Sequence, residues 1–391
     1  MARLASVFFF FLLCFQVFAQ KTSRDSYAVP SVAPVIPAAQ TKSVDGIAHF
    51  INRHYKTPQE KVQAIYQWLA ANVVYDVQAL SLGPQYYERQ ALITQTLATR
   101  KALCQGYAEV FHALCAQTGI PSYLITGFVV PRSTSTPRSH AWCAAQLDGQ
   151  WYLFDPTWGA GQLENGTFVS RINQRYYMVP PARMVQTHLP FDPLWQFLPQ
   201  PLTYEEFLSS KATSPRPKRT FVFLDSLAAY AAASPKAQLA GTIRRMEAHK
   251  MIPAVALEQL NDLRKNQAVI QHNETVDLFN QAVTSFNHGI DQLNQFTRYK
   301  NQRFYPVKPE TELRKMTTSC TAQFQEAKRL LQLVKSRNNT QLLLPLENLN
   351  SQVENALMQA KSQEMFVTRY LKTPLKQRPA LFYKQALAEK E

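Results

Sequence analysis

Residues 140–155 read HAWCAAQLDGQWYLFD, and this stretch decides the fold of the region around it. Asp148-Gly149 lies between two apolar runs, which is the strongest short-range signal for a two-residue β-hairpin turn. We therefore predict two antiparallel strands, 139–147 and 150–155, joined by a tight turn.

The register of this hairpin brings a histidine and a carboxylate to one face of the sheet. If Leu147 faces Gln150, then His140 and Asp155 are diagonal neighbours, because side chains two apart on a strand share a face. Their α-carbons would lie about 7–8 Å apart, close enough for an imidazole to meet a carboxylate. Asp155 would then orient His140 and stabilise its protonated form. A bulge in the hairpin would break this parity.

Cys104 lies in the segment KALCQGYAEVFH, residues 101–112. Apolar residues follow it at helical spacing as far as Thr118-Gly119, so we expect Cys104 at or just before a helix N-terminus. The unpaired N–H groups and the helix dipole there favour a thiolate, and they could also hold a developing oxyanion. The alternative is an inert cysteine packed in the core. A histidine base supplied by His140 favours the reactive interpretation.

The remaining histidines and cysteines are weaker candidates. His112 is eight residues along the same helix as Cys104, a rise of about 12 Å, so it cannot be the base. Cys115 is too far along that helix to be cross-linked to Cys104, and Cys143 projects from the strand face opposite to His140. The sequence contains no tight turn, like the one that relates His140 to Asp155, that would place a carboxylate beside the following five histidines: His54, His188, His249, His272 and His288. No pair of cysteines has zinc-ligand spacing, so we expect no metal and no cofactor.

Four motifs in this order resemble the transglutaminase-like superfamily, and they look closest to its branch related to the kyphoscoliosis peptidase, as found in exported bacterial proteins. These motifs are KVQAIYQWLAANVVYD (61–76), KALCQGYAEVFH (101–112), HAW (140–142) and WYLFDPTWGAG (151–161). The resemblance covers roughly residues 45–200. It implies an α+β, papain/transglutaminase-like core with an antiparallel sheet and a nucleophile helix. It also implies Cys104 as nucleophile, His140 as base and Asp155 as the orienting residue.

Two positions depart from the family pattern. Cys143 stands where the family commonly has Asn after His-Ala-Trp, and Ala102 stands where Gly is frequent before the nucleophile. Neither departure removes a member of the triad. Trp68 and Tyr75 belong to the family pattern, but we interpret them mainly as core residues.

Three residues near the triad are candidates for lining a substrate cleft: Gln105, Trp142 and Trp158. Trp158 would form a wall of the cleft, because Gly159 and Gly161 let the backbone turn away just after the triad aspartate. Core packing is the alternative for Trp158.

The N-terminus indicates export. Arg3 precedes the apolar run VFFFFLLCFQVFA, residues 7–19, which has the length and the small final residue of a cleaved signal peptide. A membrane anchor is the alternative, but the run is shorter than the roughly 20 residues of a bilayer span. Leu13 before Cys14 is too large for a lipoprotein signal. We expect cleavage after Ala19, no transmembrane segment in the mature chain, and a periplasmic or extracellular protein.

Length and composition indicate two domains. The chain has 391 residues, of which 46% are hydrophobic and 12% aromatic, enough for at least one substantial core. We predict a flexible linker at 20–44, a transglutaminase-like domain at 45–200, a Pro-rich basic linker at 201–220 and a helical domain at 221–391. Three apolar stripes at three- and four-residue spacing predict a helical bundle or coiled-coil-like packing in the last region: 276–293, 313–334 and 346–360. Cys320 belongs to the second stripe and is expected to be buried.

The net charge of +15 lies mainly in the C-terminal half. From residue 211 onward there are 27 Lys and Arg against 15 Asp and Glu, a balance of +12. Such a half suits an anionic cell-envelope surface, although a solvated basic helical face explains it as well. Export and the lack of a motif argue against nucleic acid.

Together these features predict a secreted cysteine acyl-transfer enzyme that acts on a peptide or protein substrate. A peptidase or amidase is favoured over a cross-linking transglutaminase. The alternative is a catalytically silent transglutaminase-like module that binds or scaffolds in the cell envelope.

Overall fold

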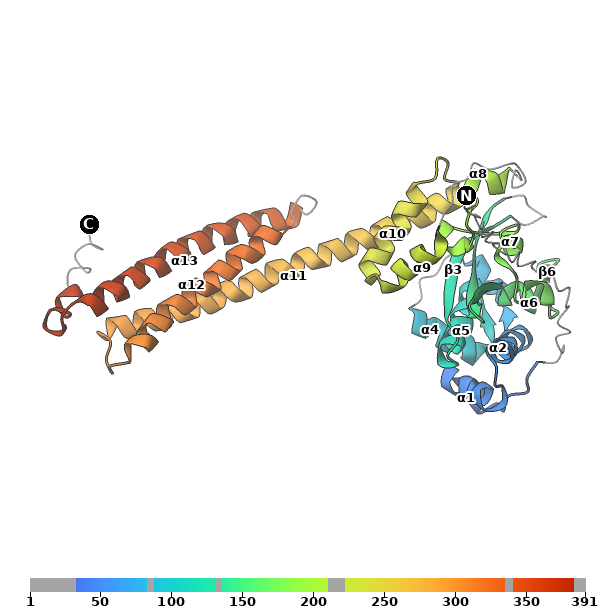
Figure 1. Ribbon diagram of the computed structural model, residues 1–391, viewed down its shortest axis with the longest axis horizontal. Helices are drawn as coiled ribbons and strands as arrows, with labels where there is room; N and C mark the ends of the chain where they lie inside the picture. Colours follow the sequence, from blue (N-terminus) through green and yellow to red (C-terminus); the bar gives the residue numbers. More distant parts are fainter. Residues whose placement is uncertain (1–32, 83–87, 131–135, 210–221, 335–339, 383–391) are drawn as a thin grey trace, which may run out of the picture. The chain divides into compact units, whose positions relative to one another are not determined.

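The computed structural model of the chain describes five stretches (Figure 1), which are residues 33–82, 88–130, 136–209, 222–334 and 340–382. The predicted signal peptide lies outside these residues. The chain divides into two compact units, one formed by the chain up to Leu124 with Trp142–Val179, the other by Ile125–Ala141 with Pro180 onward.

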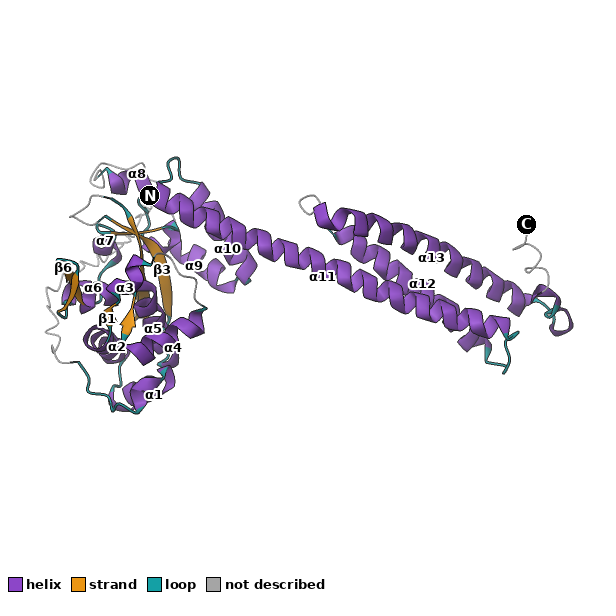
Figure 2. Ribbon diagram, turned by 180° about the vertical axis from the view of Figure 1, so that it is seen from behind, coloured by secondary structure: helices purple, strands orange, loops and turns teal. Residues whose placement is uncertain are grey.

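A four-stranded sheet of order β5-β4-β3-β8 contains the predicted hairpin (Figure 2). Its strands are β3 (Ser122–Val129), β4 (Arg138–Leu147), β5 (Gln150–Phe154) and β8 (His188–Pro190). The predicted hairpin is confirmed, because β4 and β5 pair antiparallel with Leu147 opposite Gln150 and continue in register to Cys143 opposite Phe154. Asp148 and Gly149 have φ of 48° and 77°, the positive values that a type I′ turn requires.

The first unit also contains several helices. They are α1 (Val44–His54), α2 (Pro58–Asn72), α3 (Val77–Ser81), α4 (Arg89–Thr99), α5 (Cys104–Gln117) and α6 (Pro156–Ala160), with the short helices η1 (Gln40–Lys42) and η2 (Gln174–Tyr176). Two small strand pairs complete it: β1 (Val74–Tyr75) with β2 (Lys101–Ala102), and β6 (Gly161–Glu164) with β7 (Thr167–Ser170). α2 begins at Pro58, because Thr57 at the N-cap and Glu60 in the first turn form a reciprocal capping box. Trp68 on α2 and Phe111 on α5 are fully buried.

Residues 33–44, the described part of the predicted linker at 20–44, make contacts within the fold. Ile36 and Thr41 are buried, and η1 forms inside the predicted linker. The Thr41 hydroxyl donates to the carbonyl of Ala38, and the Thr41 carbonyl accepts from Arg100 at 3.0 Å. These contacts fix the chain several residues before α1.

The second unit includes shorter elements before and after β8. They are α7 (Pro181–Met184), η3 (Pro193–Gln196), α8 (Tyr204–Leu208), α9 (Phe223–Ala232) and α10 (Pro235–Glu247). One apolar cluster joins Phe128 and Leu189 of the sheet to Ile243 and Met246 of α10. Residues on both sides of the predicted linker at 201–220 therefore share one core, and α8 lies inside the predicted linker. Residues 210–221 are outside the described residues.

A buried ion pair fixes α10 in the same unit. Asp192 is 2% exposed, and its carboxylate accepts two hydrogen bonds from Arg245 at 2.7 and 2.6 Å and one from Thr242 at 2.9 Å. One of its oxygens also accepts from the backbone N–H of Leu194 and caps η3.

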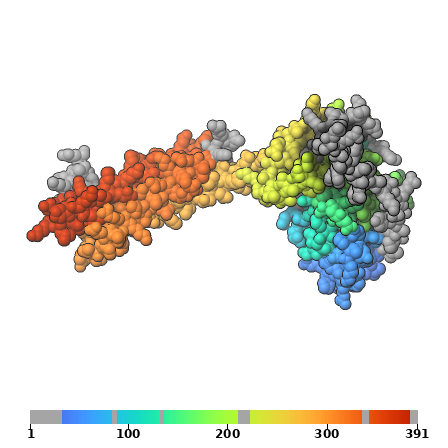
Figure 3. Space-filling model, in the orientation of Figure 1, coloured from blue at the N-terminus to red at the C-terminus, as the bar shows by residue number. Residues whose placement is uncertain are grey.

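Three long helices form the C-terminal part, and the predicted helical region is confirmed. They are α11 (Ala254–Asn301), α12 (Glu310–Leu333) and α13 (Thr340–Lys372), followed by the short helix η4 (Leu375–Gln377). The predicted stripes meet in one apolar cluster that contains Cys320, Phe324 and Val353. Figure 3 shows α12 and α13 packed alongside the C-terminal half of α11. Among the described residues, no helix combines the length and the apolar content needed to cross a membrane.

Candidate active site

Cys104 is the first residue of α5, as the sequence predicts. The parallel pair β1–β2 holds the chain just before it, since the N–H of Asp76 donates to the carbonyl of Ala102 at 3.0 Å. The first N–H groups of a helix have no acceptor inside the helix. The backbone N–H groups of Cys104 and Gln105 are of this kind, because both residues lie in the first turn of α5. This position suits a thiolate and an oxyanion.

Cys104 also differs from the other described cysteines in exposure. It is half-buried, whereas Cys115, Cys143 and Cys320 are buried. Burial raises the pKa of all three buried thiols, which keeps them protonated and unreactive. Cys143 occupies its strand as a packing residue, and its Sγ lies 3.4 Å from the carbonyl oxygen of Ala108.

His140 and Asp155 are brought together with a second histidine. His140 lies on β4, and Asp155 follows β5 directly, just beyond the last pair of the two strands, Cys143 opposite Phe154. One ring nitrogen from each of His140 and His188 and one carboxylate oxygen of Asp155 lie within 4.8 Å of one another. All three residues are buried, with 7%, 1% and 0% of their surface exposed in the order His140, His188, Asp155.

Asp155 is held in place by the start of α6. Its Oδ1 accepts from the N–H groups of Thr157 and Trp158 at 2.9 and 3.1 Å, so this oxygen serves as the N-cap. The other carboxylate oxygen, Oδ2, can accept from an imidazole. Burial, with the negative charge of Asp155 second, raises the pKa of both Tyr66 and Tyr107. Those two phenols therefore stay neutral beside the carboxylate.

Gly159 permits this arrangement by close packing. A β-carbon at position 159 would lie 2.1 Å from the hydroxyl oxygen of Tyr66. That hydroxyl is fixed, because it donates to the carbonyl of Asn173 at 2.7 Å. Gly159 is therefore needed because α6 packs directly against Tyr66. The sequence predicts a different reason, namely that this glycine lets the backbone turn away. Gly161 has a φ of 162° and is extended.

His188 is the site residue that sequence reasoning missed. It lies on β8 opposite Val129 of β3, and its ring centroid is 5.5 Å from that of His140. Its Nδ1 is hydrogen-bonded to the Thr187 hydroxyl at 2.7 Å. No tight turn in the sequence places a carboxylate beside His188, but Asp155 lies in the same group. Two imidazoles and a carboxylate are also a donor set that zinc accepts.

The three candidates for the cleft differ in exposure. Gln105 is exposed, Trp158 is half-buried, and Trp142 is only 1% exposed. The Trp158 ring packs edge-on against Tyr176, with centroids 5.2 Å apart. Their role in a cleft stays a prediction. Ala102, the second departure from the family pattern, is buried, and its β-carbon would lie 2.8 Å from a β-carbon built on Gly106.

Comparison with known proteins agrees with this geometry. Residues 45–156 match the family model described as the Transglutaminase-like superfamily, so the chain carries a transglutaminase-like domain. The kyphoscoliosis peptidase of Mus musculus is 34% identical over 160 residues, which are 39% of this chain and 24% of the mouse protein. The kyphoscoliosis peptidase of Homo sapiens is 31% identical over 184 residues, which are 44% of this chain and 27% of the human protein.

These likenesses confirm the predicted superfamily and branch, whereas export and a bacterial origin stay predictions. The matches span about a quarter of the length of the two curated relatives. A solved structure described as the crystal structure of a TGase is 17% identical, with a TM-score of 0.26, and the match covers 41% of this chain and 40% of that one.

Proposed function

We propose that the protein is a cysteine acyl-transfer enzyme that acts on peptide-like amides through Cys104, His140 and Asp155. The observation that carries the proposal is the contrast among the described cysteines, of which the half-buried one begins a helix and the other three are buried. The buried group of His140, Asp155 and His188 supports the assignment of a histidine base and an orienting carboxylate, and two of its members, His140 and Asp155, lie within the matched residues 45–156.

The proposed chemistry runs through a thioester on Cys104. His140 takes the proton of the Cys104 thiol, and Asp155 stabilises the imidazolium that forms. Sγ then attacks the carbonyl carbon of the substrate amide, and the N–H groups at the start of α5 hold the oxyanion. His140 returns the proton to the leaving amine, which leaves a thioester on Cys104. Water or an amine attacks the thioester, and the thiol is regenerated.

We favour water as the second nucleophile and therefore a peptidase or amidase. The relatives named as peptidases support this choice, although each is matched over about a quarter of its length. Export to the periplasm or the extracellular space belongs to the same proposal and rests on the apolar run at 7–19. An amine as second nucleophile would make the protein a cross-linking transglutaminase.

The alternative is a silent transglutaminase-like module that binds a partner in the envelope. A triad can persist in a fold without turnover, and the basic C-terminal half offers a surface for binding. The two functions differ in one property, because only the enzyme forms a covalent thioester at Cys104.

The test is incubation of the protein with an extract of envelope proteins and peptidoglycan, followed by mass spectrometry of the products. The variant is Cys104→Ala, and the matched control is Cys320→Ala, which removes a buried thiol from the helical region. Products that appear with wild type and Cys320→Ala but not with Cys104→Ala support the proposal. New termini indicate cleavage, altered side chains indicate deamidation, and joined peptides indicate cross-linking. No difference between wild type and Cys104→Ala would reject enzymatic function on these substrates.

A further inference from the structure

The end of the three-helix region where α11 stops and α12 starts is built around aromatic side chains. Figure 1 shows the connection after α11 and the turn after α13 at this same end. Phe304 lies at the centre, with ring centroids 4.8 Å from Tyr370 and 6.0 Å from Phe296. We name residues 298–315 and 369–378 the basic tip.

The basic tip holds a dense positive charge. Its two segments contain ten Lys and Arg residues against two glutamates, a balance of +8 out of the +15 of the whole chain. The two glutamates are engaged, since Glu312 pairs with Lys308 and Glu310 lies 4.0 Å from Arg378. Within the described part of the chain, no carboxylate lies at ion-pair distance from Lys315, Lys372 or Lys376. The charge of the tip is therefore not balanced locally.

Apolar side chains protrude among these cations. Tyr305, Val307 and Leu375 are 73%, 87% and 75% exposed, and they lie on the two turns that end the helices. A hydrogen bond holds the turn after α11 in place, because the Tyr299 hydroxyl donates to the carbonyl of Pro306 at 2.6 Å. Arg378 likewise stacks over the Tyr370 ring. Exposed apolar side chains at fixed positions on a cationic surface mark an interaction site.

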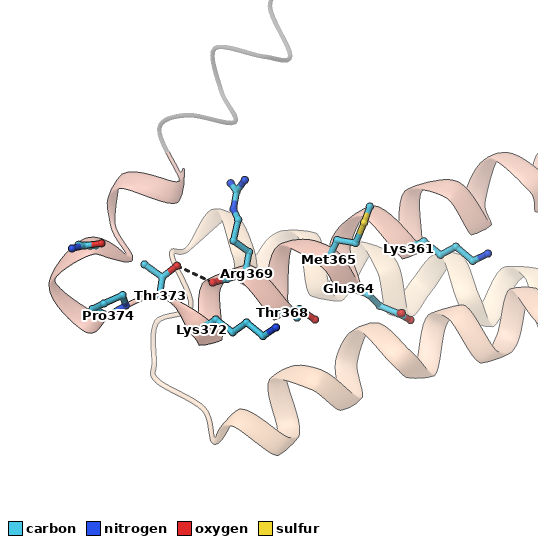
Figure 4. Close-up of a pocket in the computed structure, with 9 residues that line it drawn as sticks. Lys361, Glu364, Met365, Thr368, Arg369, Lys372, Thr373 and Pro374 are labelled. Atoms are coloured by element: carbon cyan, nitrogen blue, oxygen red, sulfur yellow. Dashed lines mark hydrogen bonds between the residues drawn. The ribbon is translucent and has the colours of Figure 1, made fainter.

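A hollow along α13 extends the same surface. It has a volume of about 780 Å³, and Lys361, Arg369 and Lys372 line it beside the exposed Met365 (Figure 4). Glu364 is the one acidic residue in its lining. Cations and apolar side chains alternate here as they do on the turns.

We propose that the basic tip docks on the surface of a bilayer that contains anionic lipids. Lys and Arg at a bilayer surface are attracted to anionic headgroups, and Tyr, Val and Leu gain by entering the boundary between headgroups and acyl chains. A soluble polyanion or a nucleic acid would match the charge, but it would leave Val307 and Leu375 in water. The apolar residues on the turns therefore favour the bilayer. This docking is independent of the chemistry at Cys104.

The test measures binding of the full-length mature chain to vesicles of phosphatidylcholine with and without phosphatidylglycerol. We expect binding only to the anionic vesicles, and weaker binding as salt rises. Replacing Lys315, Lys372 and Lys376 by Gln should weaken binding by about a hundredfold, since each lysine at an anionic surface contributes about fivefold. The matched control replaces the exposed Lys56, Lys250 and Lys265 by Gln, which changes the net charge equally, and it should bind like wild type.

A second variant separates a bilayer from other polyanions. Val307→Ser combined with Leu375→Ser should weaken vesicle binding by about tenfold and leave heparin binding unchanged, because only the bilayer has an apolar interior to offer. Circular dichroism of each variant establishes that it is folded. Equal binding to both vesicle types, an equal loss in the lysine control, or vesicle binding by the serine variant at the wild-type level would overturn the proposal.

Discussion

Gly159→Ala tests how tightly the fold holds Asp155, the aspartate of the proposed triad. The new β-carbon would lie 2.1 Å from Oη and 2.5 Å from Cζ of Tyr66, whereas ordinary contact begins at 3.4 Å. The helix α6 or the tyrosine must therefore move by about 1.3 Å. Tyr66 is fully buried and its hydroxyl is held by Asn173, so we expect α6 to shift and to carry Asp155 with it.

Two quantities should change in this variant. Overpacking a well-packed core typically costs about 1–3 kcal/mol, and the fixed tyrosine places this site near 3 kcal/mol. A displacement of about 1 Å at a catalytic group can cost roughly a hundredfold in rate. Urea unfolding followed by circular dichroism measures the first quantity. The rate at which a thiol-reactive peptide probe labels Cys104 measures the second.

Gly166→Ala is the matched control for Gly159→Ala. Gly166 has a φ of 79°, and a β-carbon there would meet nothing within 4 Å. Alanine at this position should cost about 1 kcal/mol from backbone strain and leave the labelling rate unchanged. A Gly159→Ala variant with wild-type stability and a wild-type labelling rate would refute the close packing of α6 as the reason for the glycine.

Three further outcomes follow from buried charges and histidines. Arg245→Met should lower the free energy of unfolding by about 3 kcal/mol, because it leaves the buried carboxylate of Asp192 without its cation. The control is Arg244→Met at an exposed position, which should lower it by less than about 0.5 kcal/mol. Burial lowers the pKa of His249, so the unfolded state binds a proton first as the pH falls through about 6.5. Stability should therefore fall from pH 7.5 to pH 5.5 in urea titrations, less steeply in His249→Phe, and equal slopes would contradict this. His188→Gln should keep the melting temperature within a few degrees yet change the pH profile of Cys104 labelling, since His188 lies in the same buried group as Asp155. An unchanged profile would exclude a role of His188 at the site.

Local signals in the sequence were sufficient for the hairpin, the start of α5 and the three long helices. A two-residue Asp-Gly turn fixes the register of β4 and β5, so the relation between His140 and Asp155 could be worked out from residue numbers. Apolar stripes with a helical period likewise predicted that Cys320 is buried, and it lies inside the core of the helical region.

Features that depend on distant parts of the chain could not be predicted in this way. His188 reaches the site because β8 pairs with β3, and no tight turn in the sequence fixes that pairing. Gly159 is constrained by Tyr66, which lies far away in sequence on α2. The same reason explains the stretch at 201–220, because its prolines indicate a linker while Leu202 and Tyr204 pack into a core formed by later helices.

The most direct test of Cys104 as an activated nucleophile is its alkylation rate as a function of pH. Iodoacetamide is added to native protein between pH 5.5 and 9.5, and mass spectrometry of peptides follows each cysteine separately. We expect Cys104 to react at a rate that is already near its maximum at pH 7, and we expect His140→Gln to lose this behaviour. A Cys104 rate that rises about tenfold per pH unit and levels off only above about 8.5, as for an ordinary thiol, would contradict the proposed catalytic role.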